Sequence, residues 1–274
     1  YTIIDAFCGC GGLSFGLNMS KRFDTLLGLD IKPEALATFA LNHATFGRLA
    51  PQTILSDIKD VRPDQLISAV SQAERNELDC LVGGPPCEGF TQNRTESESG
   101  LRSHKFIDDP RNYLFRRFVD LAATLQPKVV VIENVPDLVR HRDGETREEI
   151  LAALDAAGYR ASVRVLNAAD YGVPQIRRRA FFIAQRKGDF NKHGIKLHFP
   201  TPTHTSYPML HETLMDDPSW LPGDSGYWVN VREAIDDLPI ATAFESNETS
   251  NSTYPDAIIT NFRSLMRSHN GVLY

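Results

Sequence analysis

The 274-residue chain is predicted to fold as an α/β protein built on a doubly wound, mostly parallel sheet. Over residues 1 to 135, short apolar runs alternate with helical patterns, which is typical of parallel strands joined by crossover helices. Conformationally special or polar residues follow the ends of these runs, where such sheets bind their ligands. They are Gly9, Asp30, Asp57, Cys87 and Glu133.

The predicted elements follow one another in a regular order. Strands are expected at 2–7, 25–29, 53–55, 78–82 and 128–132, and helices at 13–20, 33–41, 62–77 and 112–125. Pro33 stands in the first turn of its helix, where proline is tolerated. A further helix from Glu145 to about 157 precedes strands near 160–166 and 180–185. Beyond residue 190 the pattern weakens, and 200–202, 222–223 and 245–255 are predicted to be loops.

Composition excludes several classes of protein. The net charge of −6 argues against binding nucleic acid by general attraction, although small basic clusters occur at 116–117, 140–142 and 177–179. No signal peptide or membrane-spanning run is evident, which favours a cytoplasmic or nuclear protein. The four cysteines lack the paired spacing of a zinc site or of a disulfide scaffold, so we expect no metal.

The most informative segment is Gly83-Gly84-Pro85-Pro86-Cys87, which follows a buried strand. Proline fixes φ and removes a backbone donor, so this turn is stiff and presents the Cys87 thiol outward. A buried, small hydrophobic residue is the ordinary alternative for a single cysteine. The flanking glycines and prolines favour a displayed nucleophile instead.

The first turn, residues 5–12, ends a strand and opens a helix, and its glycines let the backbone approach a ligand closely. Asp30 lies about twenty residues on, where nucleotide-binding folds place a carboxylate on ribose hydroxyls. The turn is not GxGxxG and the chain has no P-loop lysine, which argues against dinucleotides and nucleoside triphosphates. S-adenosylmethionine, with ribose and adenine but no phosphate, fits better. Asp57 could accept a hydrogen bond from the adenine amine, or could cap a helix.

Glu133 ends the strand adjacent to the Cys87 segment. No motif in the sequence singles out a histidine as the base that would activate Cys87, so acyl transfer by a Cys–His pair is not expected. A thiolate facing a carboxylic acid suits conjugate attack on a pyrimidine. The thiolate adds at C6, the acid engages N3 and the exocyclic amine, and C5 becomes nucleophilic enough to take a methyl group from a sulfonium.

With these residues in place, the chain resembles a cytosine-C5 DNA methyltransferase over about residues 2 to 185. Five motifs stand in the family's order. Phe7-x-Gly9-x-Gly11-Gly12 resembles the family's cofactor loop, and Gly84-Pro85-Pro86-Cys87 resembles its nucleophile loop. Asp109-x-Arg111-x-x-Leu114 resembles the segment that follows the nucleophile loop, and Glu133-Asn134-Val135 resembles the acid motif. Gln175-x-Arg177-x-Arg179, which follows Tyr171 and Pro174, resembles the family's Gln-x-Arg-x-Arg strand.

The resemblance implies a role for each matching residue. Cys87 would be the nucleophile, Glu133 would hold and protonate cytosine at N3, Arg179 would contact O2, and Arg177 would support the loop. Alternation along a strand puts the two arginines on one face, which would equally suit an exposed surface. The cofactor pocket would be lined by Phe7, Gly9, Gly11, Gly12, Asp30, Ile31, Asp57, Ile58, Pro85 and Leu114.

The resemblance also implies a Rossmann-like sheet of the S-adenosylmethionine-dependent methyltransferase type. Residues 1–189 would form the catalytic domain, and residues 190–274 a linker and the start of a target-recognition region. The family's closing motifs have no counterpart here, so we expect a missing C-terminal segment or a second polypeptide to supply recognition. Two departures stand out, because Glu88 replaces the usual Gln and Asp30 the usual Glu.

The implied substrate is double-stranded DNA. Its target base must be flipped out of the stack, and residues 92–105 are a candidate loop to close over it. A role in restriction–modification is compatible with this activity. A tRNA cytosine methyltransferase on the same fold and a non-catalytic binding module remain open alternatives.

Overall fold

The structure is a computed structural model that describes residues 1–46, 50–72, 77–86, 112–189, 197–206, 226–235, 252–253 and 272–273. The chain divides into two compact units. The first holds Tyr1–Val165 and Arg179–Phe199, and the second holds Leu166–Arg178 and Pro200–Tyr274. Residues 166–178 thus group with the second unit, although the sequence analysis counts them with the first. The functional boundary at residue 189 stays a prediction.

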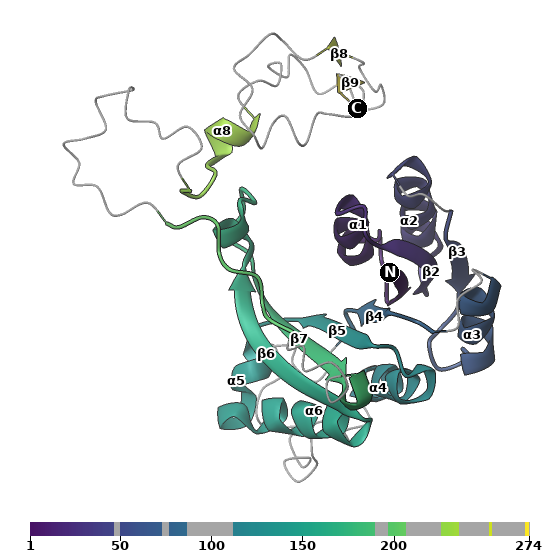
Figure 1. The fold of residues 1–274 in the computed structure, drawn as a ribbon. Coiled ribbons are helices and arrows are strands. Elements are labelled where there is room, and N and C mark those ends of the chain that lie inside the picture. Colours follow the sequence, from purple (N-terminus) through teal and green to yellow (C-terminus); the bar gives the residue numbers. More distant parts are fainter. Residues whose placement is uncertain are drawn as a thin grey trace, which may run out of the picture. The chain divides into compact units, whose positions relative to one another are not determined.

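A seven-stranded sheet forms the frame, in the order β3-β2-β1-β4-β5-β7-β6 (Figure 1). Strands β1 to β5 pair in parallel along β3-β2-β1-β4-β5, and β7 pairs antiparallel with β5, so the mostly parallel sheet is confirmed. The strand order reverses direction between β1 and β4, which is the switch point where such sheets bind ligands. The strands are β1 (Thr2–Ala6), β2 (Asp24–Asp30), β3 (Gln52–Leu55), β4 (Cys80–Gly83), β5 (Val129–Asn134), β6 (Tyr159–Asn167) and β7 (Arg178–Arg186).

The predicted helices of the first unit are all present, with ends shifted by a few residues. They are α1 (Gly12–Met19), α2 (Pro33–Phe46), α3 (Pro63–Gln72), α4 (Tyr113–Leu125) and α6 (Glu145–Ala156). The short pieces α5 (Asp137–Arg140) and η5 (His141–Gly144) were not predicted, because four residues are too few to show a helical period.

The described part of the second unit contains short elements only. They are η6 (Ala168–Tyr171), α8 (Val231–Ile235), β8 (Ser252–Thr253) and β9 (Val272–Leu273). Strands β8 and β9 pair antiparallel, so the prediction of a loop throughout 245–255 is wrong at β8. A two-residue strand leaves no alternating pattern by which to recognise it.

Strand β1 is buried on both faces of the sheet. Ile4 belongs to the main core cluster, together with residues of α3, α4 and α6. Ile3 belongs to a separate cluster against which Leu13 and Leu17 of α1 pack. Because side chains alternate along a strand, Asp5 lies on the same face as Ile3, the face that α1 covers.

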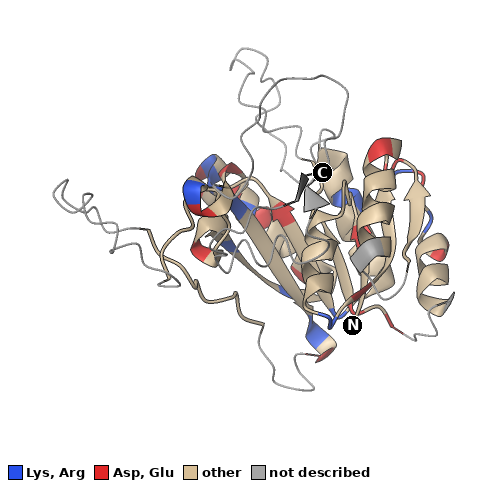
Figure 2. Cartoon of the chain, turned by 90° about the horizontal axis from the view of Figure 1, so that it is seen from above, with Lys and Arg blue, Asp and Glu red and all other residues tan. Residues whose placement is uncertain are grey.

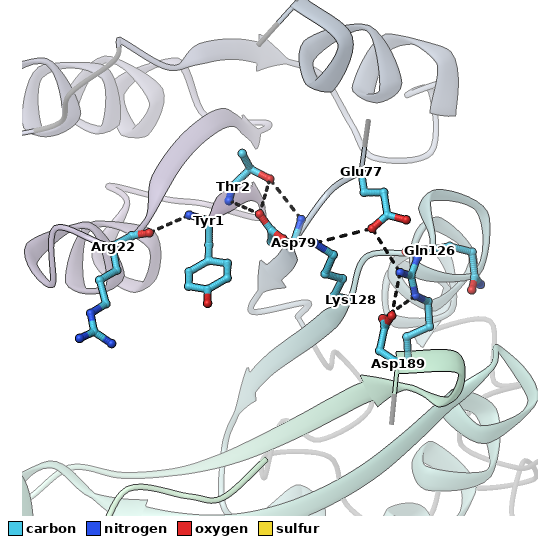
Figure 3. Close-up of polar contacts among 9 residues, drawn as sticks. Tyr1, Thr2, Arg22, Glu77, Asp79, Gln126, Lys128 and Asp189 are labelled. Atoms are coloured by element: carbon cyan, nitrogen blue, oxygen red, sulfur yellow. Dashed lines mark hydrogen bonds and ion pairs between the residues drawn. The ribbon is translucent and has the colours of Figure 1, made fainter. Parts of the chain in front are cut away.

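A polar network ties the amino ends of the strands together (Figure 3). Asp79, just before β4, accepts a hydrogen bond from the backbone N–H of Thr2 in β1 at 2.9 Å. Its other carboxylate oxygen, Oδ1, lies 2.7 Å from Nζ of Lys128, which precedes β5. Lys128 also faces Glu77 at 3.6 Å, and Arg186 of β7 pairs with Glu77 at 3.5 Å. The network therefore links the amino ends of β1, β4 and β5 to the carboxyl end of the antiparallel strand β7.

The network changes the acidity of Asp79. Burial alone would raise the pKa of this carboxyl group, but the hydrogen bonds from Lys128 and Thr2 outweigh it and hold the pKa below its ordinary value. A carboxyl group that is more acidic in the folded chain stabilises the fold above its unfolded pKa of about 4. That contribution is lost as the pH falls through the folded-state pKa.

We expect Asp79→Asn to lower the free energy of unfolding by about 1–2 kcal/mol at pH 7, because an amide oxygen accepts these hydrogen bonds more weakly than a charged carboxylate does. The effect stays this small because Lys128 is partly exposed to solvent. The deficit should shrink when urea unfolding is repeated below pH 4. Asp155→Asn is the matched control, because its ion pair with Lys187 is largely exposed and should contribute little. A deficit that is the same at both pH values would contradict this account.

Candidate active site

The residues expected to carry chemistry follow neighbouring strand ends of the first unit. Ala6, the last residue of β1, pairs with Leu29 of β2 and Gly83 of β4, and Gly83 pairs with Ile132 of β5. The turn after β1, the end of β2, the Pro85 segment and Glu133 therefore meet at one edge. Cys87 and Glu88 lie outside the described residues, as do Asp109, Arg111 and the candidate loop 92–105.

The glycine turn after β1 is closed by backbone hydrogen bonds. Cys8 N–H donates to Leu29 O at 3.0 Å, and Gly11 N–H donates to Cys8 O at 2.8 Å. Phe7, with a φ of 61°, packs partly buried against the core and lies 6.4 Å from the Phe118 ring. A Cβ added at Gly9 would meet no atom within 4 Å. The backbone at Gly9 thus borders open space, and any side chain at this position would enter that space. The absence of a side chain is consistent with a nucleoside approaching the backbone closely.

Asp30 is held in place at the end of β2 by two backbone donors. Gly9 N–H donates to its Oδ2 at 2.8 Å, and Lys32 N–H donates to its Oδ1 at 3.0 Å. Each carboxylate oxygen keeps a further lone pair with which to accept hydrogen bonds from a ligand. The neighbouring Ile31 is 60% exposed. The Asp30 carboxylate is thus oriented so that it could accept hydrogen bonds from ribose hydroxyls, and the exposed Ile31 side chain beside it could contact an apolar part of the ligand.

Asp57 closes a turn that follows β3. Its Oδ1 accepts a hydrogen bond from Lys59 N–H at 3.0 Å, and its Oδ2 lies 3.5 Å from Lys59 Nζ. It does not cap a helix, because α3 begins only at Pro63. Ile58 is buried in the main core, and Leu114 packs against that core while partly exposed. Roles for these three residues in cofactor binding stay predictions.

Glu133 and Arg179 form an ion pair across adjacent strands. Arg179 Nε lies 2.9 Å from Glu133 Oε1, and both side chains are between a quarter and a third exposed. The antiparallel pairing of β5 with β7 brings them together. On the other side, a Cβ added at Gly84 would lie 3.2 Å from Glu133 Oε2. The carboxylate therefore occupies a narrow place between the glycine of the nucleophile segment and the guanidinium group.

Asn134 fastens the nucleophile segment to the end of β5. Its Nδ2 donates to Pro85 O at 2.9 Å, and its Oδ1 accepts from Val135 N–H at 2.8 Å. The sequence analysis gave Asn134 no role, although it stands beside the acid Glu133 in the same motif. Its burial and its double hydrogen bond identify it as the residue that fixes Pro85, two positions before Cys87.

Arg177 does not lie in a strand. It precedes β7, which begins at Arg178, and it belongs to the second unit, where its carbonyl oxygen accepts a hydrogen bond from Ala168 N–H at 2.9 Å. Strand alternation therefore applies only from Arg178 onward, and the shared face of Arg177 and Arg179 stays a prediction. The role of Arg177 stays a proposal.

Charged residues are interspersed over the described elements (Figure 2). Two of the basic clusters have partners within the chain, because Arg117 donates to the carbonyls of Ile58 and Val61, and Arg142 pairs with Glu149 at 3.7 Å. Within the described residues, no group of three His, Cys, Asp or Glu side chains could hold a metal ion. None of the described helices is long and apolar enough to cross a membrane.

Comparisons with known proteins place the chain in a family. The family model for C-5 cytosine-specific DNA methylases matches residues 1–270. The chain is 35% identical over 229 residues to the type II methyltransferase M1.HphI of Haemophilus parahaemolyticus, covering 84% of this chain and 56% of that one. It is 33% identical over 270 residues to M.AgeI of Thalassovita gelatinovora, covering 97% and 57% respectively.

A solved structure shows the same fold. A prophage-encoded protein of E. coli, described as a DNA modification methyltransferase, superposes with a TM-score of 0.68 at 23% identity, covering 99% of this chain and 70% of that one. This chain spans little more than half the length of M1.HphI and M.AgeI. The match over residues 1–270 shows that the chain belongs to the C-5 cytosine-specific DNA methylase family.

Proposed function

We propose that this protein transfers a methyl group from S-adenosylmethionine to C5 of cytosine in double-stranded DNA. The observation that carries the proposal is the ion pair between Glu133 and Arg179, placed beside the segment that leads to Cys87. Asn134 holds that segment through Pro85, which precedes Cys87 by two positions in the sequence. Because the matched relatives are named type II methyltransferases, a restriction–modification setting forms part of the proposal.

The cofactor would lie over the glycine turn. The open space at Gly9 and the oriented carboxylate of Asp30 fit a nucleoside, and the proposed pocket continues over Ile31 and Pro85. When bound, S-adenosylmethionine supplies an electrophilic methyl group on a sulfonium. The chain's own residues have to hold the ribose, exclude water and present the base to that methyl group.

The proposed reaction begins with the Cys87 thiolate, whose electron pair forms a bond to C6 of the flipped cytosine. Glu133 gives a proton to N3 as the ring electrons shift, and Arg179 holds O2 and the Glu133 carboxylate. C5 then takes the methyl group. Loss of the C5 proton to a base lets the C5–H electrons restore the C5=C6 double bond as the C6–S bond breaks and releases the thiolate. N3 then returns its proton to Glu133.

DNA contact needs more positive surface than the described residues offer. The net charge is −6, and Arg117 and Arg142 are already engaged within the chain. We therefore propose that target recognition draws on segments outside the described residues or on a second polypeptide.

The test uses duplex DNA containing 5-fluorocytosine together with S-adenosylmethionine. Fluorine cannot leave C5 as a proton does, so the enzyme should stay covalently attached and migrate as a protein–DNA adduct. Cys87→Ser should form no adduct, whereas Cys10→Ser, which changes an exposed cysteine of the glycine turn, should still form one. Absence of an adduct from the full-length protein would sink the proposal. Methylation of tRNA but not of DNA would establish the alternative substrate.

Replacing Glu133 by Gln should lower the turnover rate about 10²–10⁴-fold, because proton donation to N3 is lost. Arg179→Lys should also be impaired, because an ammonium group cannot reproduce the guanidinium geometry beside Glu133. Radiolabelled methyl transfer measures both variants, and binding of S-adenosylhomocysteine should be unchanged in each. Turnover within twofold of wild type in Glu133→Gln would exclude it as the acid.

Asn134→Asp should slow adduct formation at least as much as Asn134→Ala, about tenfold or more. The Asp side chain has the same shape but places a second oxygen against Pro85 O, where Asn134 donates a hydrogen bond. The rate of adduct formation on the 5-fluorocytosine duplex measures the effect. An Asn134→Asp protein that reacts at the wild-type rate would show that the tie to Pro85 has no part in positioning Cys87.

A further inference from the structure

Asn42 of α2 donates a hydrogen bond to the glycine turn, although the proposed reaction gives it no role. Its Nδ2 lies 3.0 Å from Cys10 O, which belongs to the peptide group between Cys10 and Gly11. The N–H of the same peptide group, that of Gly11, donates to Cys8 O at 2.8 Å. The oxygen and the N–H of a trans peptide group point in opposite directions, so this group is held on both sides. Its orientation depends on Asn42 at one of them.

The second peptide group of the turn continues this chain of hydrogen bonds to Asp30. Cys8 O, which accepts from Gly11, belongs to the peptide group whose N–H is that of Gly9. Gly9 N–H donates to Asp30 Oδ2 at 2.8 Å. All three hydrogen bonds run in the same direction, from Asn42 towards the carboxylate, and hydrogen bonds aligned in this way polarise and strengthen one another. Asn42 is therefore linked to the carboxylate that is expected to receive the ribose hydroxyls.

Gly11 makes a partner outside the turn necessary. Its φ is +88°, and glycine adopts positive and negative φ about equally well. A peptide group turns over when the ψ of the residue before it and the φ of the residue after it change together. With glycine in the second position the backbone offers little resistance to this movement, so the hydrogen bonds decide the orientation. A side-chain amide that donates, as Asn42 does, selects the orientation in which Cys10 O faces α2.

Buried rings of α2 keep Asn42 beside the turn. The rings of Phe39 and His43 are both fully buried and are stacked with their centroids 4.2 Å apart. A Cβ added to Gly11 would lie 2.7 Å from His43 Cε1 and 2.8 Å from Phe39 Cδ2. His43 Nε2 also lies 3.2 Å from Ser14 Oγ, which joins α2 to α1. Because these contacts fix the helix against the turn, the Asn42 side chain stays within reach of its acceptor.

Loss of the hydrogen bond from Asn42 would loosen both peptide groups of the turn. Once the first group turns over, the N–H of Gly11 no longer faces Cys8 O, and the second group loses the donor that holds its oxygen. That second group carries the N–H that orients Asp30, whose other donor is Lys32 N–H at 3.0 Å. The shape of the turn and the direction of the Asp30 carboxylate would therefore change together.

We propose that Asn42 is a positioning residue for the cofactor. Through Cys10 O it sets the orientation of the glycine turn, and through the turn it sets the direction of the Asp30 carboxylate. This inference rests on the proposed function. Because Asn42 acts through the turn, its loss weakens binding of the nucleoside and leaves the chemistry at the base unchanged. The groups assigned to the base, Glu133 and Arg179, lie on β5 and β7.

Calorimetry with S-adenosylhomocysteine tests the hydrogen bond from Asn42. Asn42→Ala removes the donor and should raise the Kd about three- to tenfold, as expected for the loss of one hydrogen bond. Asn42→Asp keeps the shape but replaces the donor by an oxygen that repels Cys10 O and favours the overturned peptide group. It should therefore bind at least as weakly as Asn42→Ala. The inference is overturned if Asn42→Asp binds more tightly than Asn42→Ala, or if either Kd stays within twofold of wild type.

Thr38→Asp is the matched control for the added charge. Thr38 is exposed one turn before Asn42 on the same side of α2, and its hydroxyl donates to Glu34 O within the helix. This variant should bind S-adenosylhomocysteine as wild type does. A Kd raised as much as in Asn42→Asp would show that the charge is responsible rather than the hydrogen bond, and would contradict the inference.

Kinetics separate positioning from a general loss of stability. Asn42→Ala should raise the KM for S-adenosylmethionine about as much as it raises the Kd, and kcat at saturating cofactor should stay within twofold of wild type. A variant that is only destabilised would instead show fewer binding sites per chain in calorimetry, with an unchanged Kd. That pattern, or a lower kcat with an unchanged KM, would rule out the positioning role.

A second measurement needs no ligand. The N–H of Gly11 donates to Cys8 O only while its peptide group has the orientation that Asn42 selects. Amide hydrogen exchange of Gly11, followed by NMR with isotopically labelled glycine, should be about threefold faster or more in Asn42→Ala and unchanged in Thr38→Asp. Equal rates in Asn42→Ala and wild type would overturn the inference. A wild-type protein that binds no S-adenosylhomocysteine would contradict the proposed function instead, and Gly11 exchange would still decide whether Asn42 orients the turn.

Discussion

The parallel pairing of β1 with both β2 and β4 is the constraint on which the rest of the molecule depends. Parallel strands in register must end at the same edge, so the turn after β1, the carboxylate of Asp30 and the Pro85 segment are brought together by the sheet. The conformation of each turn then determines only the direction in which its side chain or backbone group points. The close approach of Gly84 to Glu133 is of this kind, because the backbone there leaves little room for a side chain.

The two edges of the sheet have different electrostatic characters. At the amino edge, Asp79 and Lys128 satisfy each other at 2.7 Å and join strands that are distant in sequence. At the carboxyl edge, Asp30 keeps unused acceptor capacity, and Glu133 and Arg179 stay partly exposed. The carboxylate of Asp79 is thus engaged by other strands of the chain, whereas that of Asp30 can still accept hydrogen bonds from a ligand.

The sequence was sufficient to predict the strand ends, because apolar runs and the residues that follow them reflect the geometry of a parallel sheet. It singled out Glu133 and Arg179 as candidates, but it could not show that they pair, since that depends on β7 joining β5 in the antiparallel sense. The role of Asn134 was missed because it depends on a contact with Pro85, which is far from it in sequence. The alternation argument does not extend to Arg177, because β7 begins at Arg178 and the ends of a strand are the least certain part of any pattern.

The late position of β7 in the sequence has a consequence for the order in which the site is assembled. Glu133 lies near the end of β5, and the other parallel strands β1 to β4 all precede it in the sequence, whereas Arg179 follows more than forty residues later. During synthesis the carboxylate is therefore made well before its guanidinium partner. Long-range pairing of this kind forms slowly, because the intervening chain must first be ordered. The acid that would act on the base thus acquires its partner only when β7 has joined the sheet beside β5.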